Sequence, residues 1–443
     1  MIVEWSRSRT FDGATRVQGP LATPETDLCT KVQLADLPSG ARVHYRVRFE
    51  GERPSEWLEG SLATAPEDAR DVLFAWSGDT NGQGFGIDPS RGGMPAYRAL
   101  LERAPEFFVH CGDTIYADNP IPPEIALPDG STWRNVVTEA KSHVAQTLAD
   151  FRGAHLYPRL SAEVRAASAS VPIVSIWDDH EIRNDWFPGQ IIEDDPAYTT
   201  TRIDDLVPSA RRAFLEYQPT LRDPRAPMYR SFRWGPRLEV FLVDGRSHRT
   251  PNYPLPSDAR FFGPEQLAWL EDAVGRSTAT WKVIACDMPI GLVLAAAAPK
   301  GVVAWEGFGN GDGPPIGREL EIARLLRTWK ERRVKNVVFL TADVHYAAAH
   351  RYSPERAVWK EMDPFWEFVA GPMHAGSFPQ KPLDDTFGPE VVWASHDRAT
   401  FGSPATGQQY FGLVRIDGKT GAMIVSLVDG AGRTLHTTSL QPD

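Results

Sequence analysis

The stretch Val171-Pro172-Ile173-Val174-Ser175-Ile176-Trp177-Asp178-Asp179-His180-Glu181 decides how this sequence is interpreted. It begins with a short apolar run that is typical of a buried strand, and it ends with three acids and a histidine within five residues. Polar groups at that density make a poor core and an unusual turn. We therefore expect a strand whose carboxyl end carries a functional site.

Four other apolar runs end in the same way. The runs and the residues that follow them are Val72–Trp76 with Asp79, Phe107–His110 with Asp113 and Tyr116, Leu238–Val243 with Asp244 and Arg246, and Val337–Leu340 with Asp343 and His345. One Gly-Asp after a strand is more often a turn than a ligand, but the repeat across five runs favours a cluster. Ligands bind at the carboxyl edge of open α/β sheets, so we expect these side chains to meet there.

Segments of helical period lie between several of the apolar runs. They are Tyr97–Arg103, Pro264–Gly275 and Arg318–Arg333, and Val283–Cys286 is a further apolar run. This alternation predicts the α/β fold class, with a layered core of sheets flanked by helices over residues 67–443. Near the end, Tyr410–Ile416 and Ala422–Val428 predict a hairpin, and His436–Leu440 a further strand.

Residues 1–66 have a different pattern that predicts β structure. Val32–Leu34 and Val43–Phe49 alternate between apolar and polar residues, and a turn signal lies between them. Tyr45, shortly after that turn, is similar to the tyrosine corner of a fibronectin- or immunoglobulin-like β-sandwich. Such a sandwich needs about 100 residues, so we expect this one to be incomplete, with one or two strands missing at its start.

Composition excludes several function classes. A net charge of −11 argues against a general nucleic-acid binder, which needs a basic surface. No apolar run approaches the roughly 20 residues of a membrane span, and the first residues lack the pattern of a signal peptide. Three cysteines imply no disulfide framework. The sequence therefore predicts a soluble protein.

Several carboxylates brought together would repel one another and lose solvation unless cations accompany them. Hard oxygen ligands suit divalent or trivalent ions. Asp113 could bridge two such ions, which would activate a water and hold the oxygens of a phosphoryl group. The five runs together therefore predict a metal centre.

The ordered set resembles the metallophosphoesterase superfamily, whose blocks run Gly-Asp, Gly-Asp-x-x-Tyr, Asn-His-Glu, a His and Gly-His-x-His. It is most similar to the alkaline phosphatase D (PhoD-like) branch, where the third block is Trp-Asp-Asp-His-Glu and the last is Asp-Val-His. Here these blocks are Trp177–Glu181 and Asp343–His345, and Gly112–Asp118 resembles the second. The first block, Ser77-Gly78-Asp79, replaces the Ser-Cys-Gln of the branch and is similar to that of the purple acid phosphatases.

The resemblance implies two or more metal ions. The first would be held by Asp79, Asp113, Tyr116 and His345, where a phenolate ligand favours Fe³⁺. The second would share Asp113 and add Asp179 and Asp343, an oxygen-rich set that suits Ca²⁺, Mn²⁺ or Mg²⁺ better than Zn²⁺. Asp287 falls where the superfamily's fourth-block histidine usually stands.

The resemblance also implies which residues meet the substrate. His180 occupies the position of the histidine that contacts the substrate and protonates the leaving oxygen. Asp113 and Arg246 are the other expected catalytic residues, and Arg183 and Asn184 are expected to contact phosphate or to support the site.

The function implied is hydrolysis of phosphate mono- or diesters, small or polymeric, by a water that two metals activate. Two alternatives stay open. One is a phosphodiesterase or phospholipase D-type activity on lipid or wall polymers. The other is a non-catalytic surface or carbohydrate-binding protein on a phosphatase-like core, which the 14 tryptophans favour slightly.

Signals in the sequence for the cellular location, the oligomeric state and the substrate pocket are weaker. The family resemblance implies a periplasmic or secreted protein, and no residue pattern predicts the oligomeric state. Loops 118–135, 186–206 and 290–316 are expected to shape the substrate pocket. Their aromatic residues could line its mouth or cap the core: Trp186, Phe187, Trp305 and Phe308.

Overall fold

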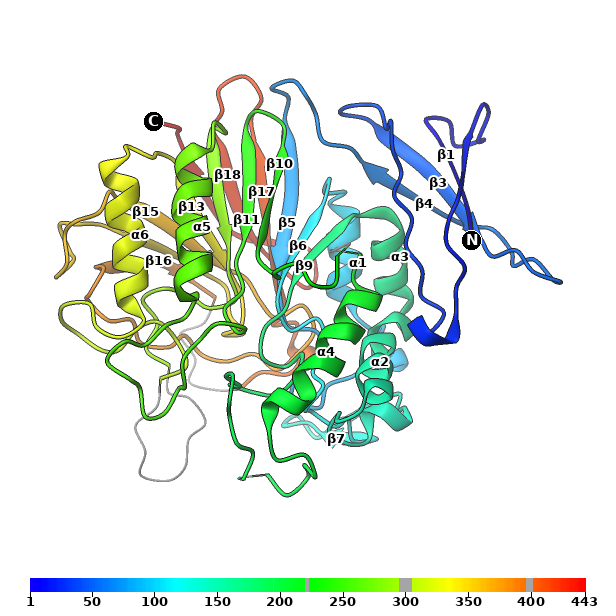
Figure 1. Ribbon diagram of the computed structural model, residues 1–443, viewed down its shortest axis with the longest axis horizontal. Coiled ribbons are helices and arrows are strands. Elements are labelled where there is room, and N and C mark those ends of the chain that lie inside the picture. Colours follow the sequence, from blue (N-terminus) through cyan, green and yellow to red (C-terminus); the bar gives the residue numbers. More distant parts are fainter. Residues whose placement is uncertain (194, 220–222, 295–304, 396–400) are drawn as a thin grey trace.

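Two β-sheets pack face to face at the centre of the computed structural model (Figure 1), which describes residues 1–443 except 194, 220–222, 295–304 and 396–400. The six-stranded sheet has the order β19 (Thr434–Leu440), β18 (Met423–Asp429), β17 (Tyr410–Ile416), β5 (Val72–Ser77), β6 (Phe108–Cys111) and β9 (Ile173–Ile176). The seven-stranded sheet has the order β10 (Arg230–Trp234), β11 (Leu238–Leu242), β12 (Trp281–Ala285), β13 (Val337–Thr341), β15 (Phe365–Val369), β14 (Ala348–Tyr352) and β16 (Pro389–Ala394). Strands β5, β6 and β9 run parallel, as do β11, β12, β13 and β15.

Alternation along each strand divides the apolar side chains between two faces. Phe74 and Trp76 enter the core between the sheets, whereas Ala75 faces the opposite way, towards helices. In β11, Val240 faces the inner core and Phe241 the outer one. Both sheets are therefore covered on two faces, which explains why their strands are continuous apolar runs in the sequence.

Helices cover the outer face of each sheet. Helices α1 (Pro95–Glu102) and α3 (Ala162–Ser170) pack on the six-stranded sheet, and α5 (Gly263–Arg276) and α6 (Glu319–Glu331) pack on the seven-stranded one (Figure 1). Helices α2 (Leu148–Leu156) and α4 (Ile203–Tyr217) pack against each other and are joined by an Arg152–Glu216 ion pair of 2.7 Å. The expected α/β core of sheets flanked by helices is confirmed.

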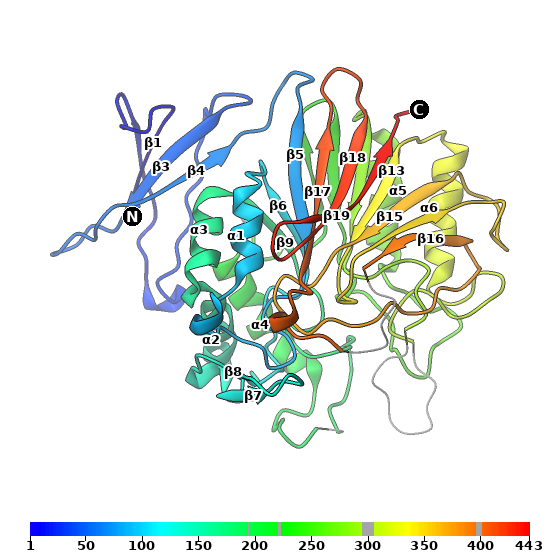
Figure 2. The ribbon, with the colours of Figure 1, turned by 180° about the vertical axis from the view of Figure 1, so that it is seen from behind.

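The individual sequence predictions for this core hold in most places. Each predicted apolar run overlaps a strand, and each predicted amphipathic segment overlaps α1, α5 or α6. The C-terminal hairpin forms as β17 and β18, with β19 added, and Figure 2 shows these strands beside β5. The predicted loop 118–135 also contains a small hairpin, β7 (Glu124–Ala126) with β8 (Thr132–Arg134).

The N-terminal region contributes one antiparallel sheet of order β2-β1-β3-β4. Its strands are β1 (Ile2–Ser6), β2 (Thr15–Gln18), β3 (Arg42–Arg48) and β4 (Leu58–Ala63). The predicted strand at 32–34 is wrong: the neighbouring Lys31 donates hydrogen bonds to the carbonyls of Leu215 and Gln218 at the end of α4, so this segment lies along the helix. The described residues of this region form a single layer, so the sandwich stays a prediction, as does a boundary at 66/67.

Tyr45 anchors this sheet to the core rather than closing a turn within it. Its hydroxyl donates a 3.0 Å hydrogen bond to the carbonyl of Ala169 in α3. Gly60 lies opposite, and a Cβ there would stand 2.2 Å from the same carbonyl oxygen. The contact therefore requires a glycine at this position.

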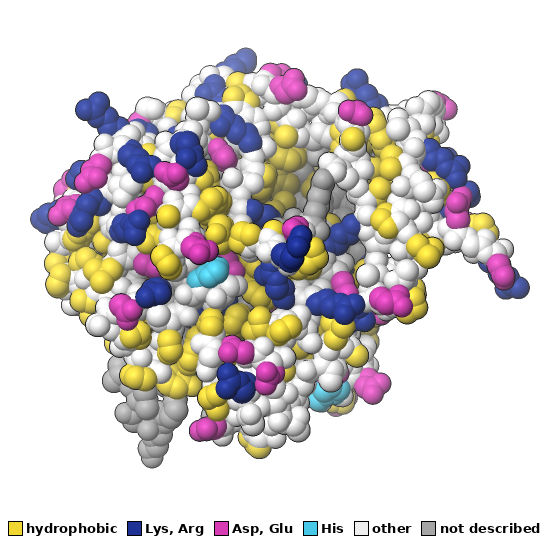
Figure 3. Space-filling model, viewed as in Figure 1, with side chains coloured by type: hydrophobic (Ala, Val, Ile, Leu, Met, Phe, Trp, Pro, Cys, Tyr) yellow, Lys and Arg dark blue, Asp and Glu magenta, His cyan; other side chains and the backbone are white. Residues whose placement is uncertain are grey.

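Surface charge and helix length concern the predictions about nucleic-acid binding and membrane spans. Basic and acidic side chains are interspersed over the face shown in Figure 3, without a basic stripe. Within the described ranges, every helix is too short or too polar to span a bilayer.

Candidate metal centre

The predicted site residues stand in loops that follow the parallel strands. Asp79 comes two residues after β5, Asp113 two after β6 and Asp179 three after β9. Asp343 and His345 follow β13 of the other sheet. Because both sheets direct these carboxyl ends to one edge, residues far apart in sequence meet there.

The backbone of these loops is turned sharply. Asp79, Asp113, Asp343 and His345 have φ values of 65°, 53°, 60° and 58°, in the left-handed region that non-glycine residues rarely enter. Gly112 has a φ of 108°, and a Cβ there would lie 2.4 Å from the Cβ of Asp178. Such strain persists only where surrounding contacts hold it, and it is concentrated at functional sites.

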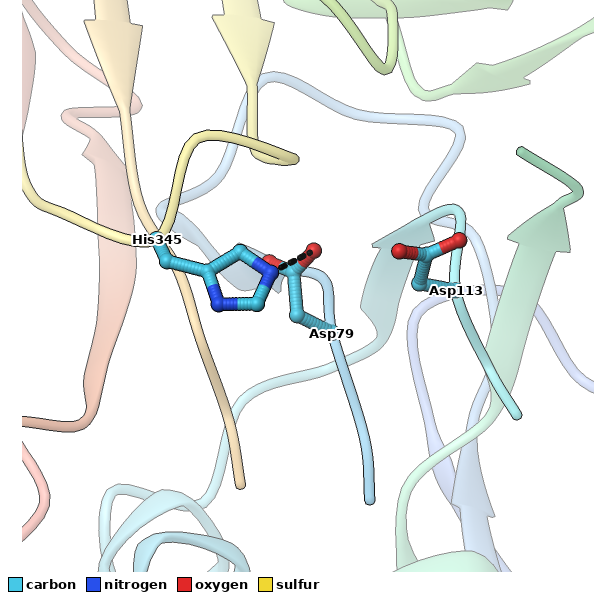
Figure 4. Close-up of side chains that lie close together, drawn as sticks. All are labelled: Asp79, Asp113 and His345. Atoms are coloured by element: carbon cyan, nitrogen blue, oxygen red, sulfur yellow. Dashed lines mark ion pairs between the residues drawn. The ribbon is translucent and has the colours of Figure 1, made fainter. Parts of the chain in front are cut away.

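Three overlapping groups of potential ligands form at this edge. Within each group, one donor atom per residue lies within 4.8 Å of the others. The groups are Asp79 with Asp113 and His345, Asp113 with Asp179 and His180, and Asp178 with Asp179 and Asp343. Figure 4 shows the first group, whose members come from three separate loops. Asp113 belongs to two groups, as a bridging ligand must.

Hydrogen bonds orient the first group. The Nδ1 of His345 donates to the carbonyl of Gly376, so its Nε2 carries the lone pair. That Nε2 lies 3.3 Å from Asp79 Oδ1 (the dashed line in Figure 4) and 2.7 Å from the hydroxyl of Tyr116. A nitrogen lone pair, a carboxylate and a phenol oxygen therefore converge.

The electrostatics of this group fit a cation. Asp79 is buried, and neither of its oxygens accepts a hydrogen bond from the described residues. Burial, and next the neighbouring Asp179, raise the pKa of both Asp113 and Asp343 well above the usual range. Burial and the charge of Asp113 likewise raise the pKa of Tyr116. A bound cation would satisfy these oxygens and reverse the shifts, so the residues fit a metal centre.

His180 is held by a residue to which the sequence assigned no role. Its Nδ1 lies 2.6 Å from Asp118 Oδ1, and its ring stacks on Tyr116 at 4.1 Å between centroids. Burial alone would lower the pKa of His180, but the charges of Asp118 and Asp179 outweigh it and raise the pKa to about 9. The only signal for Asp118 in the sequence was its place as the last residue of the block Gly112–Asp118.

Glu181 ties two of the loops together. Its carboxylate accepts hydrogen bonds from the backbone nitrogens of Asp113, Thr114 and Asp178, at 3.1, 2.6 and 2.8 Å. The side chain is buried, and burial raises its pKa to about 7. Glu181 thus fixes the loops that carry Asp113 and Asp179.

Arg246 lies behind the ligands in a buried ionic network. Its guanidinium contacts Asp178 at 2.5 Å, Asp179 at 3.8 Å and also Glu306. Arg249 pairs with the same Glu306 at 2.5 Å. Arg246 is fully buried, which favours a supporting role over contact with substrate. Glu306 had no sequence signal, because it stands in a loop without a motif.

The remaining predicted residues lie at the margins of the centre. Asp287 is buried and belongs to none of the three ligand groups; its Oδ1 accepts a 3.1 Å bond from the thiol of Cys286. Arg183 is mostly buried, with its guanidinium 5.6 Å above the Tyr198 ring. Asn184 is exposed, and its backbone nitrogen donates to Asp118.

The loops expected to shape the pocket contribute to the core. Trp186, Phe187 and Phe308 are buried, so they cap the core instead of lining a mouth. Residues 295–304 of the loop 290–316, and residue 194 of the loop 186–206, lie outside the described residues.

Two packed sheets carry carboxylates and histidines at their common carboxyl edge. The PhoD-like phosphatase family model matches residues 74–427, which is most of the chain, and the chain belongs to this family.

Individual relatives agree with this assignment. Alkaline phosphatase D of Bacillus subtilis (strain 168) is 29% identical over 271 residues, which cover 56% of this chain and 43% of that protein's length. A solved structure of PhoD has a TM-score of 0.73 at 20% identity, covering 100% of this chain and 83% of that one. A purple acid phosphatase from yellow lupin (Lupinus luteus) seeds has a TM-score of 0.59 at 12% identity, covering 100% and 69%. The two structures establish the likeness of fold.

Proposed function

We propose that this protein hydrolyses phosphate esters with two metal ions bridged by Asp113. The observation that carries the proposal is the membership of Asp113 in two overlapping ligand groups, one with Asp79 and His345 and one with Asp179. Membership in the PhoD-like family supports the same chemistry. When bound, the two ions would supply an activated water and neutralise charge on the phosphoryl oxygens.

The protein's own residues would perform three tasks around that centre. Asp79, Tyr116 and His345 would hold one ion, and Asp179 and Asp343 the other. His180 would act on the leaving group: its Nδ1 is engaged by Asp118, which leaves Nε2 free to donate a proton. With a pKa raised to about 9, the ring carries that proton at neutral pH. Arg246 would fix the carboxylates from behind.

The chemistry of the first ligand set favours Fe³⁺ at the Tyr116 position. A phenolate is a hard ligand, and a trivalent ion would overcome the raised pKa of the Tyr116 hydroxyl. The all-oxygen set of Asp113, Asp179 and Asp343 favours Ca²⁺, Mn²⁺ or Mg²⁺. A phenolate-to-iron absorption band that disappears in Tyr116→Phe would support iron, and an iron-free active protein would contradict it.

A hydrolysis assay tests the proposal as a whole. The protein is stripped with a chelator, reloaded with single ions and pairs of ions, and assayed on p-nitrophenyl phosphate and on bis-p-nitrophenyl phosphate. We expect no turnover in the stripped protein and recovery after reloading, and the ratio of the two rates gives the mono- or diester preference. Unchanged activity after stripping, or no activity with any ion, would contradict the proposal.

A periplasmic or secreted location is the companion proposal, because the family resemblance implies export. Cell fractionation of the native host with an antibody to this protein tests it. Recovery only with cytoplasmic markers would contradict it.

A further inference from the structure

A second pair of buried carboxyl groups lies outside the metal centre. Glu319 is the first residue of α6, and Asp384 lies in the connection between β15 and β16. The two side chains are in contact, and their residues are 1% and 3% exposed. Neither belongs to the ligand groups of the metal centre.

Glu319 has better-formed hydrogen bonds than Asp384. Glu319 Oε1 accepts from the backbone nitrogen of Asn310 at 3.1 Å, and Oε2 accepts from that of Ile316 at 2.8 Å. Neither carboxylate oxygen of Asp384 accepts a hydrogen bond of normal length and angle from the described residues, although the backbone nitrogens of Gly311 and Thr386 lie near it. The Oδ1 of Asn310, whose side chain lies beside Glu319, is also without a donor in the described residues. Three buried oxygens of Asp384 and Asn310 therefore lack a well-formed hydrogen bond.

The backbone comes close to the Asp384 carboxylate. A Cβ at Gly309 would lie 2.6 Å from Asp384 Oδ2, so a side chain there would displace the carboxylate. Asp384 also lines an open cleft of about 640 Å³, which gives an ion access from solvent. Arg356 and Lys381 line the same cleft, but within the described residues neither donates to the Asp384 oxygens.

A shared proton is the rival explanation for two carboxyl groups in contact. One proton would bridge Glu319 and Asp384, yet it would satisfy at most one of the three oxygens. A divalent cation would neutralise both acids and satisfy all three oxygens at once. Carboxylate and amide oxygens with few fixed angles suit Ca²⁺ better than Mg²⁺, which demands octahedral geometry.

We propose that Glu319, Asp384 and Asn310 form a structural site for a divalent cation, with Ca²⁺ the best fit. The bound ion would join the start of α6 to the connection between β15 and β16. The site is independent of the phosphoesterase proposal, because it shares no residue with the metal centre.

Equilibrium dialysis with Ca²⁺ tests the site in the full-length protein. Asp384→Asn keeps the shape of the side chain and removes its charge, and Asp258→Asn, on the exposed surface, is the matched control. We expect the wild type and Asp258→Asn to bind one Ca²⁺ per chain more than Asp384→Asn does. Ca²⁺ should also raise Tm by a few degrees, on the order expected for a saturated site, more in the wild type than in Asp384→Asn. Equal stoichiometry in all three proteins would overturn the proposal.

A second variant separates ion binding from folding. Glu319→Gln retains the acceptor oxygen for Asn310 and should likewise lose one Ca²⁺. If neither variant folds, wild-type crystals soaked in Tb³⁺ should show an anomalous peak between Glu319 and Asp384, and its absence would overturn the site. A shared proton predicts instead that Asp384→Asn is as stable as the wild type with or without Ca²⁺, which also overturns it.

Discussion

The metal centre and the arginine network behind it both contain buried carboxylates, and they differ in how the negative charge is balanced. Asp79 and Asp113 are buried with no arginine or lysine ion pair in the described part of the chain. Asp178 and Glu306, also buried, pair with Arg246, and Glu306 also pairs with Arg249. Asp179 stands between the two regions: it belongs to two ligand groups and lies 3.8 Å from Arg246.

The difference shows which carboxylates are available to a ligand. Burial would raise the pKa of Asp179, but Arg246 and then His180 lower it to about 2, whereas the pKa of Asp113 is raised. Asp113, which has no arginine or lysine ion pair within the described residues, is held ready for an ion, whereas Asp179 is already stabilised as an anion by Arg246. The variants below should therefore fall into two kinds, those that lose activity and those that lose stability.

Asp113→Asn should have the largest effect, because it removes the ligand that the two groups share. We expect kcat to fall by at least about 10³-fold, with bound metal reduced and Tm of the metal-free protein little changed. Steady-state assays and elemental analysis measure both, with Asp258→Asn as the surface control. Near-wild-type turnover in Asp113→Asn would remove the basis for a bridged centre.

Arg246→Met should act mainly on stability. It leaves Asp178 buried without its partner and Glu306 with Arg249 alone, and breaking a buried pair costs about 3–5 kcal/mol. Urea unfolding of the metal-loaded protein measures the loss, and Arg260→Met, at an exposed ion pair, should cost less than about 1 kcal/mol. If Arg246→Met is as stable as the wild type but cannot bind phosphate, Arg246 contacts the substrate after all.

Asp118→Asn should have a smaller effect on activity, because it acts through His180. We expect kcat to fall by about 10²-fold or less with metal content unchanged. Asp118 helps to raise the pKa of His180, so its loss should move the alkaline limb of the pH–rate profile to lower pH. The loss should be smaller for esters with good leaving groups, which need no protonation. A pH profile identical to that of the wild type would show that His180 is not the acid.

The smallest of these effects should be the change that metal removal makes to the pH dependence of stability. The folded-state pKa values of Asp113 and Asp343 are raised above their unfolded values of about 4. Protonated, they favour the folded state below pH ~4, and that contribution is lost as the pH rises through the raised values. Thermal scans between pH 5 and 9 should therefore show Tm falling with pH more steeply in the stripped than in the loaded protein. Parallel curves would show that no ion binds these carboxylates.

The sequence predicted the strands that are buried on both faces and the acids that directly follow them. Strands covered on both faces are apolar runs, so β5, β6 and β9 and the acids that follow them could be found directly. Tyr45 was identified as the tyrosine corner of a sandwich, but its hydrogen bond to Ala169 in α3 could not be predicted, because the contact spans 124 residues.

The rest could not be predicted because it depends on tertiary contacts. The arginine network joins Asp178, Arg246 and Glu306 from three separate loops, and no spacing links them. The roles of Asp118 and Glu181 inside the motifs likewise appear only once the loops are folded. Residues 32–34 alternate like a strand, but the adjoining Lys31 is bonded to the end of α4, where packing overrides pattern.

Anomalous diffraction from crystals of natively purified protein tests the central claim most directly. The account predicts two ions at the sheet edge, both coordinated by Asp113, with Asp79 and His345 on one and Asp179 on the other. Data collected at the absorption edges would also identify each ion. A single ion that does not touch Asp113, or an Asp113 carboxylate that remains uncoordinated in a catalytically active crystal, would contradict it.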